Sequence, residues 1–352
     1  MKKIYIFIAI LSFFFSCSDA EKIFKGSITI VKNPKTDILL GKQLILGDLY
    51  AGYPIVFDSI ISFIHEYGDY YVANFNLNNG KHLGNYMYRG QGPGEFLDFI
   101  PLHFEDNKNF WIHEYNKRQF ILVDMSSGIE IKRINFLDFK KKGSFPFAHI
   151  FILNDSLLIA INQPEKKNFS NEIMVPKLTI INYLTLKEIT DYHSYDESLY
   201  NKLCSFGEDQ AHLLETYCIK PDKSKVVSIM TRLYQINILD LKTGKWNGYR
   251  IADTQGFNFV HTPLSITDRT YQSYYHVSVD DDFIYAMLKN IFTPDVKPVI
   301  HVFDWNGNFI RILEFDQKGT VFDIDRIQKK LYFKDQEEEE NIWVYDVSYL
   351  YK

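Results

Sequence analysis

A hairpin-forming unit recurs six times along this chain of 352 residues, and the repetition strongly constrains the fold. Each copy is a short apolar or aromatic run that ends in Asp or Asn, followed by a turn and a second run. The residues that end the first run are Asn76, Asp124, Asn182, Asp240, Asp304 and Asp346, at intervals of 48, 58, 58, 64 and 42 residues. Short Asp and Asn side chains accept hydrogen bonds from nearby backbone amides, so each marker predicts a hairpin turn.

A second unit precedes each of these hairpins and consists of an apolar run, an acidic or Asn-containing turn, and another aromatic-rich run. Its copies are SFIHEYGDYYVANF, PLHFEDNKNFWIHE, HIFILNDSLLIAI, TYCIKPDKSKVVSI, HVSVDDDFIYAML and FDIDRIQKKLYFK. The two units together make four strands in each repeat. Six such repeats predict an all-β fold, a six-bladed β-propeller of four-stranded antiparallel blades. Two β-sandwiches or one large β-barrel are the alternatives, and the paired units argue against them.

The last repeat has little chain after Asp346, so its fourth strand has to come from elsewhere. Residues 37–46 (DILLGKQLIL) and residues 53–60 (YPIVFDSI) are the two candidates. We expect one of these N-terminal strands to join the last blade and close the ring, which removes an open sheet edge. The expected domains are a signal peptide at 1–16, an N-terminal tether at 17–36, and a single propeller at 37–352.

The N-terminus carries a targeting signal. Lys2 and Lys3 precede the run from residue 4 to residue 15, which is apolar apart from Ser12. The run is short for a transmembrane helix and fits a secretory signal peptide. Its end, Ser16-Cys17, resembles a bacterial lipoprotein signal, which implies that Cys17 is lipidated and anchors the protein to a membrane. Cleavage after Ala20, which would discard Cys17, is the alternative.

Composition and charge agree with a strand-rich exported domain. Aromatic residues make up 16% of the chain, and their side chains favour pleated, half-buried sheet surfaces over helices. The formal net charge is only −5, so the chain lacks the electrostatic footprint of a nucleic-acid-binding protein. We therefore expect no nucleic-acid partner.

The stretch YMYRGQGPGEF, residues 86–96, looks at first like a phosphate-binding loop. A P-loop needs Lys and Ser or Thr directly after its last glycine, followed by a helix, whereas here Glu95 and Phe96 follow and strands resume. We interpret the stretch as architecture, the crossing from the first blade to the second, with glycines for backbone freedom and proline for stiffness. The residues of this structural motif are Arg89, Gly90, Gly92, Pro93, Gly94 and Glu95.

The lipoprotein-like start ending at Cys17, the RGQGPGEF stretch and the six hairpin markers together resemble a known family. This family comprises six-bladed β-propeller lipoproteins of Bacteroides-type bacteria, often called TolB-like or NHL-like propellers. The resemblance covers the chain from about residue 45 to the C-terminus, and G-x-G-P-G-E-F is its specific motif. It implies an exported outer-membrane lipoprotein, facing either the periplasm or the cell surface, and it carries over no catalytic residue.

Polar residues fall near the predicted inner strands, which line the central channel of a propeller. The candidates for ligand binding in the channel are His103, His149, Glu215, His276 and Asp323. Such a ring of polar groups could bind a sugar, a metal or a peptide, or its members could be hydrated channel residues and core histidines with partners of their own. No pair has a metal-site spacing such as His-Glu-x-x-His, and we expect neither a metal nor a cofactor.

Two cysteines and several aromatic residues remain to be placed. Export permits a disulfide between Cys204 and Cys218, and a buried free thiol is the alternative. Aromatic residues in loop-like segments that could stack on a sugar ring or a partner protein are Tyr271, Tyr274, Tyr275 and Trp305. A propeller needs many aromatic side chains between its blades, so we expect most of them to lie in the core.

Two functions fit these features. The first is a non-enzymatic binding or scaffold lipoprotein that presents a propeller face to a glycan, a peptide or another envelope protein. The alternative is a hydrolase or lyase with its active site in the central channel, because propellers host enzymes as well as binding proteins. The sequence contains no Gly-x-Ser-x-Gly elbow or other nucleophile motif, so no catalytic residue is predicted and binding is favoured.

Overall fold

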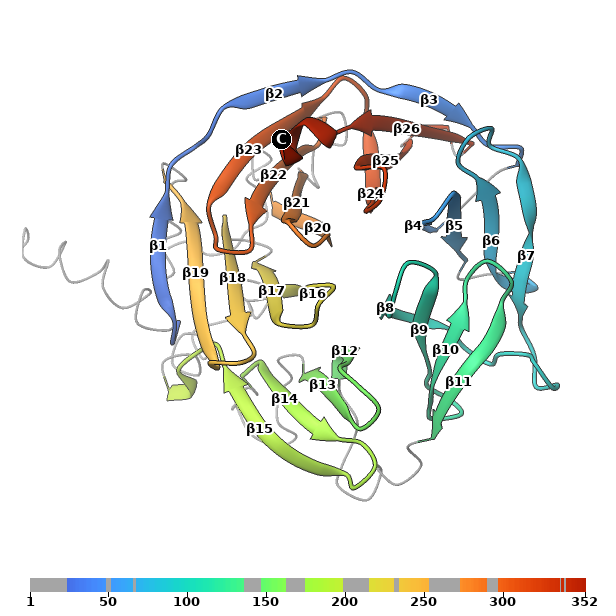
Figure 1. Cartoon of the computed structure of the whole chain (residues 1–352), viewed down its shortest axis with the longest axis horizontal. Coiled ribbons are helices and arrows are strands. Elements are labelled where there is room, and N and C mark those ends of the chain that lie inside the picture. The colour runs from blue at the N-terminus through green and yellow to red at the C-terminus, as the bar shows by residue number, and fades with distance from the viewer. Residues whose placement is uncertain are drawn as a thin grey trace, which may run out of the picture.

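The strands of the chain form six sheets, arranged as blades around a central axis (Figure 1). The computed structural model describes residues 24–48, 52–65, 68–135, 147–162, 175–198, 215–230, 234–252, 273–289, 297–335, 337–338 and 340–352. Five of the sheets contain four consecutive antiparallel strands. The last sheet contains three consecutive strands, and an N-terminal strand is its fourth. The all-β, six-bladed propeller predicted from the repeats is therefore confirmed.

Blades 1 to 3 each consist of four consecutive strands. Blade 1 contains β4 (Tyr53–Phe57), β5 (Ile60–Ile64), β6 (Tyr70–Asn76) and β7 (His82–Tyr88). Blade 2 contains β8 (Ile100–Phe104), β9 (Asn109–Glu114), β10 (Gln119–Asp124) and β11 (Ile129–Asn135). Blade 3 contains β12 (Phe147–Ile152), β13 (Leu157–Asn162), β14 (Lys177–Asn182) and β15 (Lys187–His193). The first strand of each blade lies nearest the central axis and the fourth lies at the rim (Figure 1).

Blades 4 and 5 follow the same order, and blade 6 has three consecutive strands. Blade 4 contains β16 (Glu215–Ile219), β17 (Lys225–Met230), β18 (Gln235–Asp240) and β19 (Lys245–Ile251). Blade 5 contains β20 (Ser273–Val279), β21 (Phe283–Lys289), β22 (Val299–Asp304) and β23 (Phe309–Phe315). Blade 6 contains β24 (Gly319–Asp325), β25 (Lys330–Asp335) and β26 (Asn341–Asp346), and a short 3₁₀ helix, η3 (Ser348–Tyr351), follows it.

The six marker residues all end the third strand of a blade and all accept a hydrogen bond from a backbone amide in the following turn. In blade 2, Ser126 N donates to Asp124 Oδ1 at 2.9 Å, and in blade 5, Asn306 N donates to Asp304 Oδ1 at 2.8 Å. The other four markers, Asn76, Asn182, Asp240 and Asp346, do the same. The turn chemistry predicted from the sequence is thus confirmed in every repeat.

Hydrophobic side chains fill the interfaces between neighbouring blades. In β5, Ile61 and Phe63 pack into the core shared with blade 6, whereas Ile60 and Ile64 pack into the core shared with blade 2. Successive side chains of a strand point to opposite faces of its sheet, so an apolar run without polar interruptions serves both neighbours. This explains why the strands read as continuous apolar and aromatic runs rather than as an alternating pattern.

An N-terminal belt, residues 24–46, runs along the outer rim of blades 4, 5 and 6 (Figure 1). Strand β1 (Ser27–Val31) pairs in parallel with β19, and β2 (Thr36–Leu39) pairs in parallel with β23, so each adds a fifth strand to a complete blade. Strand β3 (Lys42–Ile45) pairs antiparallel with β26 and is the fourth strand of blade 6. The other closing candidate, residues 53–60, contains β4, the inner strand of blade 1.

The belt includes residues that the sequence assigns to a tether. Residues 27–31 form β1 within the sheet of blade 4, and Phe24 is buried among the side chains of blades 3 and 4. The β-branched stretch SITIV suits a strand, and the outer edge of β19 offers unpaired backbone groups that it satisfies. The structured domain therefore begins before the expected boundary at residue 37.

Candidate functional site

The RGQGPGEF stretch lies between β7 and β8, where the chain passes from the rim of blade 1 to the inner strand of blade 2. Gly90 N donates to the Phe96 carbonyl at 3.0 Å, which brings the two ends of the loop together. Inside the loop, Gly92 N donates to Glu95 Oε2 at 2.8 Å. A Cβ on Gly90 would lie 1.9 Å from this carboxylate oxygen, so glycine leaves the room that the carboxylate occupies.

The flanks of the loop are fastened to both blades. Arg89 Nη2 donates to the His65 carbonyl at 2.8 Å, and the guanidinium carbon lies 3.7 Å from the centre of the Tyr71 ring. On the other side, Lys117 Nζ donates to the Glu95 carbonyl at 2.9 Å and pairs with the buried carboxylate of Glu114 at 2.9 Å. Arg89 thus holds a backbone carbonyl of blade 1, and Lys117 of blade 2 holds a backbone carbonyl of the loop.

Two of the predicted channel histidines bond to the inner strand of the next blade. His103 Nε2, on β8, donates to the Ile152 carbonyl at 3.2 Å, and His276 Nε2, on β20, donates to the Phe322 carbonyl at 2.8 Å. Burial, aided by the charges of Lys223 and Arg326, lowers the pKa of His103 to about 3. Burial likewise lowers the pKa of His276 to about 4. Both imidazoles are therefore neutral hydrogen-bond donors between blades.

Asp323, on β24, connects the inner strands of three blades. Its Oδ2 accepts a hydrogen bond from Val56 N of blade 1 at 2.8 Å, and its Oδ1 accepts one from Ser278 Oγ of blade 5 at 2.6 Å. Burial raises the pKa of this carboxyl, while the two donors and the charge of Arg326 act in the opposite direction. Both oxygens are engaged by protein groups.

Glu215, at the start of β16, lies in a polar network within blade 4 and at its border with blade 3. Its Oε1 accepts hydrogen bonds from Tyr195 at 2.6 Å, Asn237 at 2.9 Å and Ser228 at 3.1 Å, and its Oε2 accepts one from the Tyr217 hydroxyl. Burial raises the pKa of the Glu215 carboxyl, whereas these four donors lower it. Such a carboxylate has its acceptor capacity largely filled by the protein.

His149, on β12, is the fifth candidate and lies beside this network. Its ring centre is 5.4 Å from that of Tyr217, and burial lowers its pKa to about 4. The structure thus brings His149 and Glu215 to one aromatic side chain, and His276 and Asp323 to the inner strands of blades 5 and 6. His103 lies apart from both pairs, at the interface of blades 2 and 3. Within the described ranges, no group of three or more His, Cys, Asp or Glu side chains is placed to hold a metal ion.

Most of the remaining sequence candidates fall in the core or outside the described residues. Tyr274 and Trp305 are buried between blades 4 and 5, as expected for most aromatic side chains of a propeller. Tyr275 is exposed, and Tyr271 lies outside the described residues. Cys218 Sγ lies 3.5 Å from the Val277 carbonyl oxygen, and burial raises the pKa of this thiol to about 12. Cys17 and Cys204 lie outside the described residues, so lipidation and the disulfide stay predictions.

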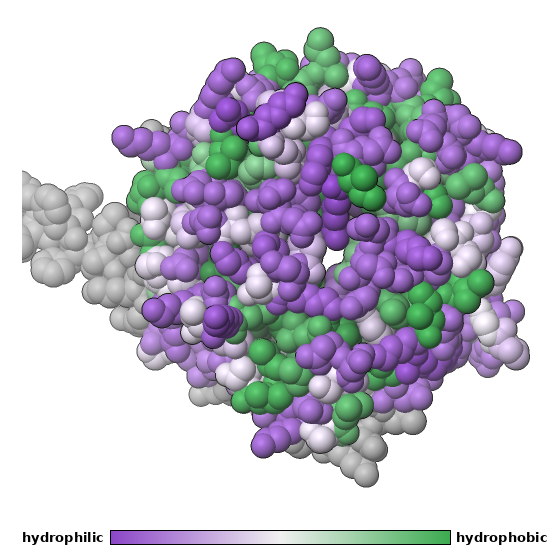
Figure 2. Space-filling view, viewed as in Figure 1, coloured by the Kyte–Doolittle hydropathy of each residue, from purple (hydrophilic) through white to green (hydrophobic). Residues whose placement is uncertain are grey.

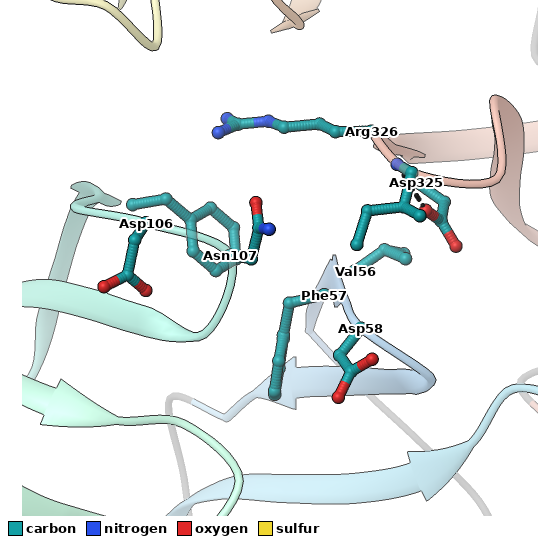
Figure 3. Close-up of a pocket in the computed structure, with 9 residues that line it drawn as sticks. Val56, Phe57, Asp58, Asp106, Asn107, Asp325 and Arg326 are labelled. Carbon is teal, nitrogen blue, oxygen red and sulfur yellow. Dashed lines mark hydrogen bonds between the residues drawn. The ribbon is translucent and has the colours of Figure 1, made fainter.

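A pocket opens where the turns after three inner strands meet, at blades 6, 1 and 2 (Figure 3). We call it the turn pocket, and the residues that line it are Val56, Phe57, Asp58, Phe104, Asp106, Asn107, Asp325, Arg326 and Ile327. The rings of Phe57 and Phe104 lie 6.1 Å apart between centres and provide apolar surface. None of the five channel candidates lines this pocket.

Arg326 extends from the blade 6 turn toward the turn of blade 2, on the side of Asn107 and Asp106 (Figure 3). Its guanidinium carbon lies 5.2 Å from the centre of the Phe104 ring, a cation–π contact that orients the half-buried side chain. Of the residues that the structure describes, none forms an ion pair or hydrogen bond with this guanidinium. The described residues therefore leave the five N–H donors of Arg326 to a ligand.

The three carboxylates of the turn pocket differ in what they contact. Asp106 Oδ1 accepts hydrogen bonds from Lys108 N and Asn109 N, and its Oδ2 accepts one from Asn109 Nδ2 at 2.7 Å. Asp325 Oδ1 likewise accepts the amides of its own turn, and burial raises the pKa of this carboxyl. Asp58 is exposed, and Figure 3 shows its carboxylate pointing away from Arg326.

Sequence reasoning did not single out Asp58, Asn107 or Arg326. Asp58 and Asn107 lie in acidic or polar turns of the kind expected in every repeat, and Arg326 lies in one such turn in FDIDRIQKKLYFK. Their positions in the repeat could have identified them, because all three lie in the turn that follows an inner strand. Equivalent turns of neighbouring blades meet around the channel. Hydrophilic residues also surround the central opening on the face of the propeller shown in Figure 2.

Comparison with known proteins defines the class of the chain. The model of the TolB-like 6-blade propeller-like family matches residues 34–327. The chain belongs to this family. No functionally curated protein matches its sequence. Within the described residues, the structure has no helix of the length and hydrophobicity needed to cross a bilayer.

Two similar solved structures come from Bacteroides species. A member of the DUF4221 family from Bacteroides vulgatus is 14% identical, with a TM-score of 0.54 over 87% of this chain and 96% of that one. A protein of Bacteroides fragilis that carries the name of an exported protein is 12% identical, with a TM-score of 0.52 over 91% of this chain and 99% of that one. At these identities the similarity shows the fold alone.

Proposed function

We propose that this chain is an exported lipoprotein, anchored to the outer membrane through Cys17, whose propeller binds a glycan at the turn pocket. The observation that carries the binding proposal is the pocket's composition. Asp58, Asn107 and Arg326 come from three different blades, and no described residue bonds to any of their side chains. Concave sites with apolar surface and a few convergent polar groups are where small ligands bind.

The chemistry of these groups suits a polyhydroxylated ligand. A sugar hydroxyl both donates and accepts hydrogen bonds, so it can pair with the guanidinium of Arg326, the amide of Asn107 and the carboxylate of Asp58. The aromatic rings of Phe57 and Phe104 provide apolar surface for the C–H groups of a sugar. A peptide or another envelope protein is the competing partner, and the experiment below separates them.

The lipid anchor is proposed from the signal-like residues 1–17. The position of the belt limits how far the propeller can lie from that anchor. Seven residue steps separate Cys17 from Phe24, which is buried at the rim of blades 3 and 4. A fully extended chain of that length reaches about 25 Å. An acylated Cys17 would therefore keep the rim of blades 3 and 4 close to the membrane, while the turn pocket lies at blades 6, 1 and 2.

Metabolic labelling with an alkyne-tagged fatty acid tests the anchor. We expect the chain to take up the label and to fractionate with the outer membrane, and we expect the Cys17→Ser variant to do neither. Labelling that persists in Cys17→Ser would show that the anchor lies elsewhere.

A glycan array probed with the detergent-solubilised chain tests the binding function. Asn107→Trp fills the turn pocket and is expected to abolish the signal. Asn78→Trp adds the same ring to an exposed turn outside the pocket and is expected to keep it. An array without signal, combined with binding of a peptide or of a purified envelope protein, would replace the glycan by that partner.

A further inference from the structure

We propose that the turn pocket recognises an acidic sugar, with Arg326 receiving the sugar's carboxylate. The inference rests on the proposed glycan-binding function and assigns the chemical class of the ligand. It follows from which charged side chains have a partner of opposite charge on the side of the propeller where the turns after the inner strands lie.

The cations near the pocket differ in whether they are neutralised. Lys223, in the blade 4 turn, bonds to both carboxylate oxygens of Glu105 at 2.8 and 2.9 Å and to the Leu153 carbonyl at 3.2 Å. Lys329, in the blade 6 turn, pairs with the buried Asp280 at 3.3 Å. Arg326 has no such partner among the described residues, although three aspartates line the same pocket.

Within the part of the chain that the structure describes, none of the three aspartates pairs with Arg326, and Asp325 Oδ2, which has no hydrogen-bond partner, is buried. Asp106 and Asp325 accept the backbone amides of their own turns. Asp58 comes from the opposite wall, and its carboxylate points away from the guanidinium (Figure 3). A half-buried guanidinium without a hydrogen-bonded carboxylate is partly dehydrated, so an incoming carboxylate gains a charge-assisted, bidentate hydrogen bond.

The remaining polar groups favour a sugar as the carrier of that carboxylate. The Asn107 amide lies on the side of the pocket toward which Arg326 extends (Figure 3) and donates as well as accepts. Asp58 offers an acceptor for hydroxyl groups and would repel a second negative charge. A ligand with one carboxylate and several hydroxyls can bond to all three side chains, whereas a simple carboxylate leaves Asp58 unused and a neutral sugar forms no ion pair with Arg326.

Calorimetric titration of the detergent-solubilised full chain tests the proposal, with glucuronate, glucose and acetate as probes. We expect glucuronate to bind more tightly than either of the other two. Arg326→Ala should weaken glucuronate binding by about tenfold or more, as expected for loss of a charged hydrogen bond. Arg326→Lys keeps the charge but loses the planar fork, and an intermediate affinity is expected.

Lys330→Ala is the matched control, because it removes a cation from the same turn region without touching the pocket. Its glucuronate affinity should equal that of the unmodified chain, and thermal unfolding should confirm that all variants are folded. Equal binding of glucose and glucuronate, or unchanged binding in Arg326→Ala, would overturn the proposal. Tighter binding of a short peptide through its free C-terminal carboxylate would overturn it in favour of a peptide ligand.

The glycan array separates failure of this inference from failure of the proposed function. Binding of neutral glycans that depends on Asn107 but not on Arg326 would reject the acidic sugar and leave glycan binding standing. An array without any signal would reject the glycan-binding function itself.

Discussion

Asp323 Oδ2 accepts a hydrogen bond from the backbone N–H of Val56 at 2.8 Å, across 267 positions of the sequence. The bond joins the inner strand of blade 6 to the inner strand of blade 1. At the rim, β3 pairs with β26 and attaches the same two ends of the chain again. The ring is therefore closed twice, by a side chain at the channel and by a backbone ladder at the rim.

Replacing Asp323 tests the inner closure. Asp323→Leu leaves Val56 N and the Ser278 hydroxyl without an acceptor, and we expect it to lower the free energy of unfolding by about 2–4 kcal/mol. Asp323→Asn keeps an acceptor for Val56 N and can donate to Ser278, so a much smaller loss is expected at pH 7. Urea unfolding of both variants provides the measurement, and equal losses would contradict the assigned role.

The same pair of variants has a pH signature. Burial raises the pKa of Asp323, so the folded chain binds this proton more tightly than the unfolded chain. The contribution of this group to stability therefore falls as pH rises from its unfolded pKa, about 3.9, through the folded one. Asp323→Asn should flatten that part of the stability profile. A profile that is unchanged in the variant would show that Asp323 does not titrate abnormally.

Buried histidines should make the propeller sensitive to mild acid. The pKa of His103 is lowered to about 3, chiefly by burial, while the unfolded residue titrates near 6.5. The unfolded state then binds protons first, and stability is lost as pH falls from about 6.5 toward 3, by about 2 kcal/mol for such a residue at pH 5. His103→Gln retains a donor for the Ile152 carbonyl and should be less destabilised by a shift from pH 7 to pH 5.

The exposed His193 provides the control for this experiment, because His193→Gln removes an imidazole that lies outside the core. Thermal unfolding at pH 7 and pH 5 provides the measurement, and His193→Gln should be as stable as the unmodified chain at pH 7 because its side chain is exposed. An equal loss for His103→Gln and the unmodified chain would contradict the prediction.

Phe24 should anchor the N-terminal belt. Its ring packs edge-on against Tyr195 at 6.2 Å and Trp246 at 6.5 Å, and it is 6% exposed. Truncating a buried Phe to Ala costs about 3–5 kcal/mol. Phe24→Ala should therefore destabilise the chain to urea far more than Thr29→Ala, which changes an exposed position of the same belt. Similar midpoints for the two variants would show that the belt contributes little at this point.

The loop after blade 1 offers a double-mutant test. Glu95→Ala frees the Gly92 amide, which should cost about 1 kcal/mol. Gly90→Ala should act through the same contact, because its Cβ displaces the Glu95 carboxylate. The two losses should therefore not add, and Gly90→Ala should cost less in a chain that already carries Glu95→Ala. Additive losses in urea unfolding would show that Gly90 is required for another reason.

The prediction of the blades succeeded because their signals are local. A marker such as Asp124 bonds to an amide two positions away, so its role does not depend on distant parts of the chain. Apolar runs such as those around Ile61 and Phe63 also report local structure, since a strand buried on both faces needs no alternation. These signals repeat six times, and the repetition predicts the six-bladed fold.

The roles of single polar residues could not be predicted in this way. His103 and His276 were recognised near inner strands, but their bonds to the carbonyls of Ile152 and Phe322 depend on how neighbouring blades face each other. Arg326 reaches Phe104, which is more than two hundred positions away in sequence, because blades 6 and 2 lie on either side of blade 1.

The sequence by itself therefore determined the number of blades, the strand-and-turn pattern of each and the family of the chain. The tertiary structure decided where the N-terminal strands lie, which polar groups already have partners and where a pocket with free donors opens. The physical reason is that turns and strands depend on residues close in sequence, whereas the belt and the turn pocket arise only when ring closure brings the first and last blades together.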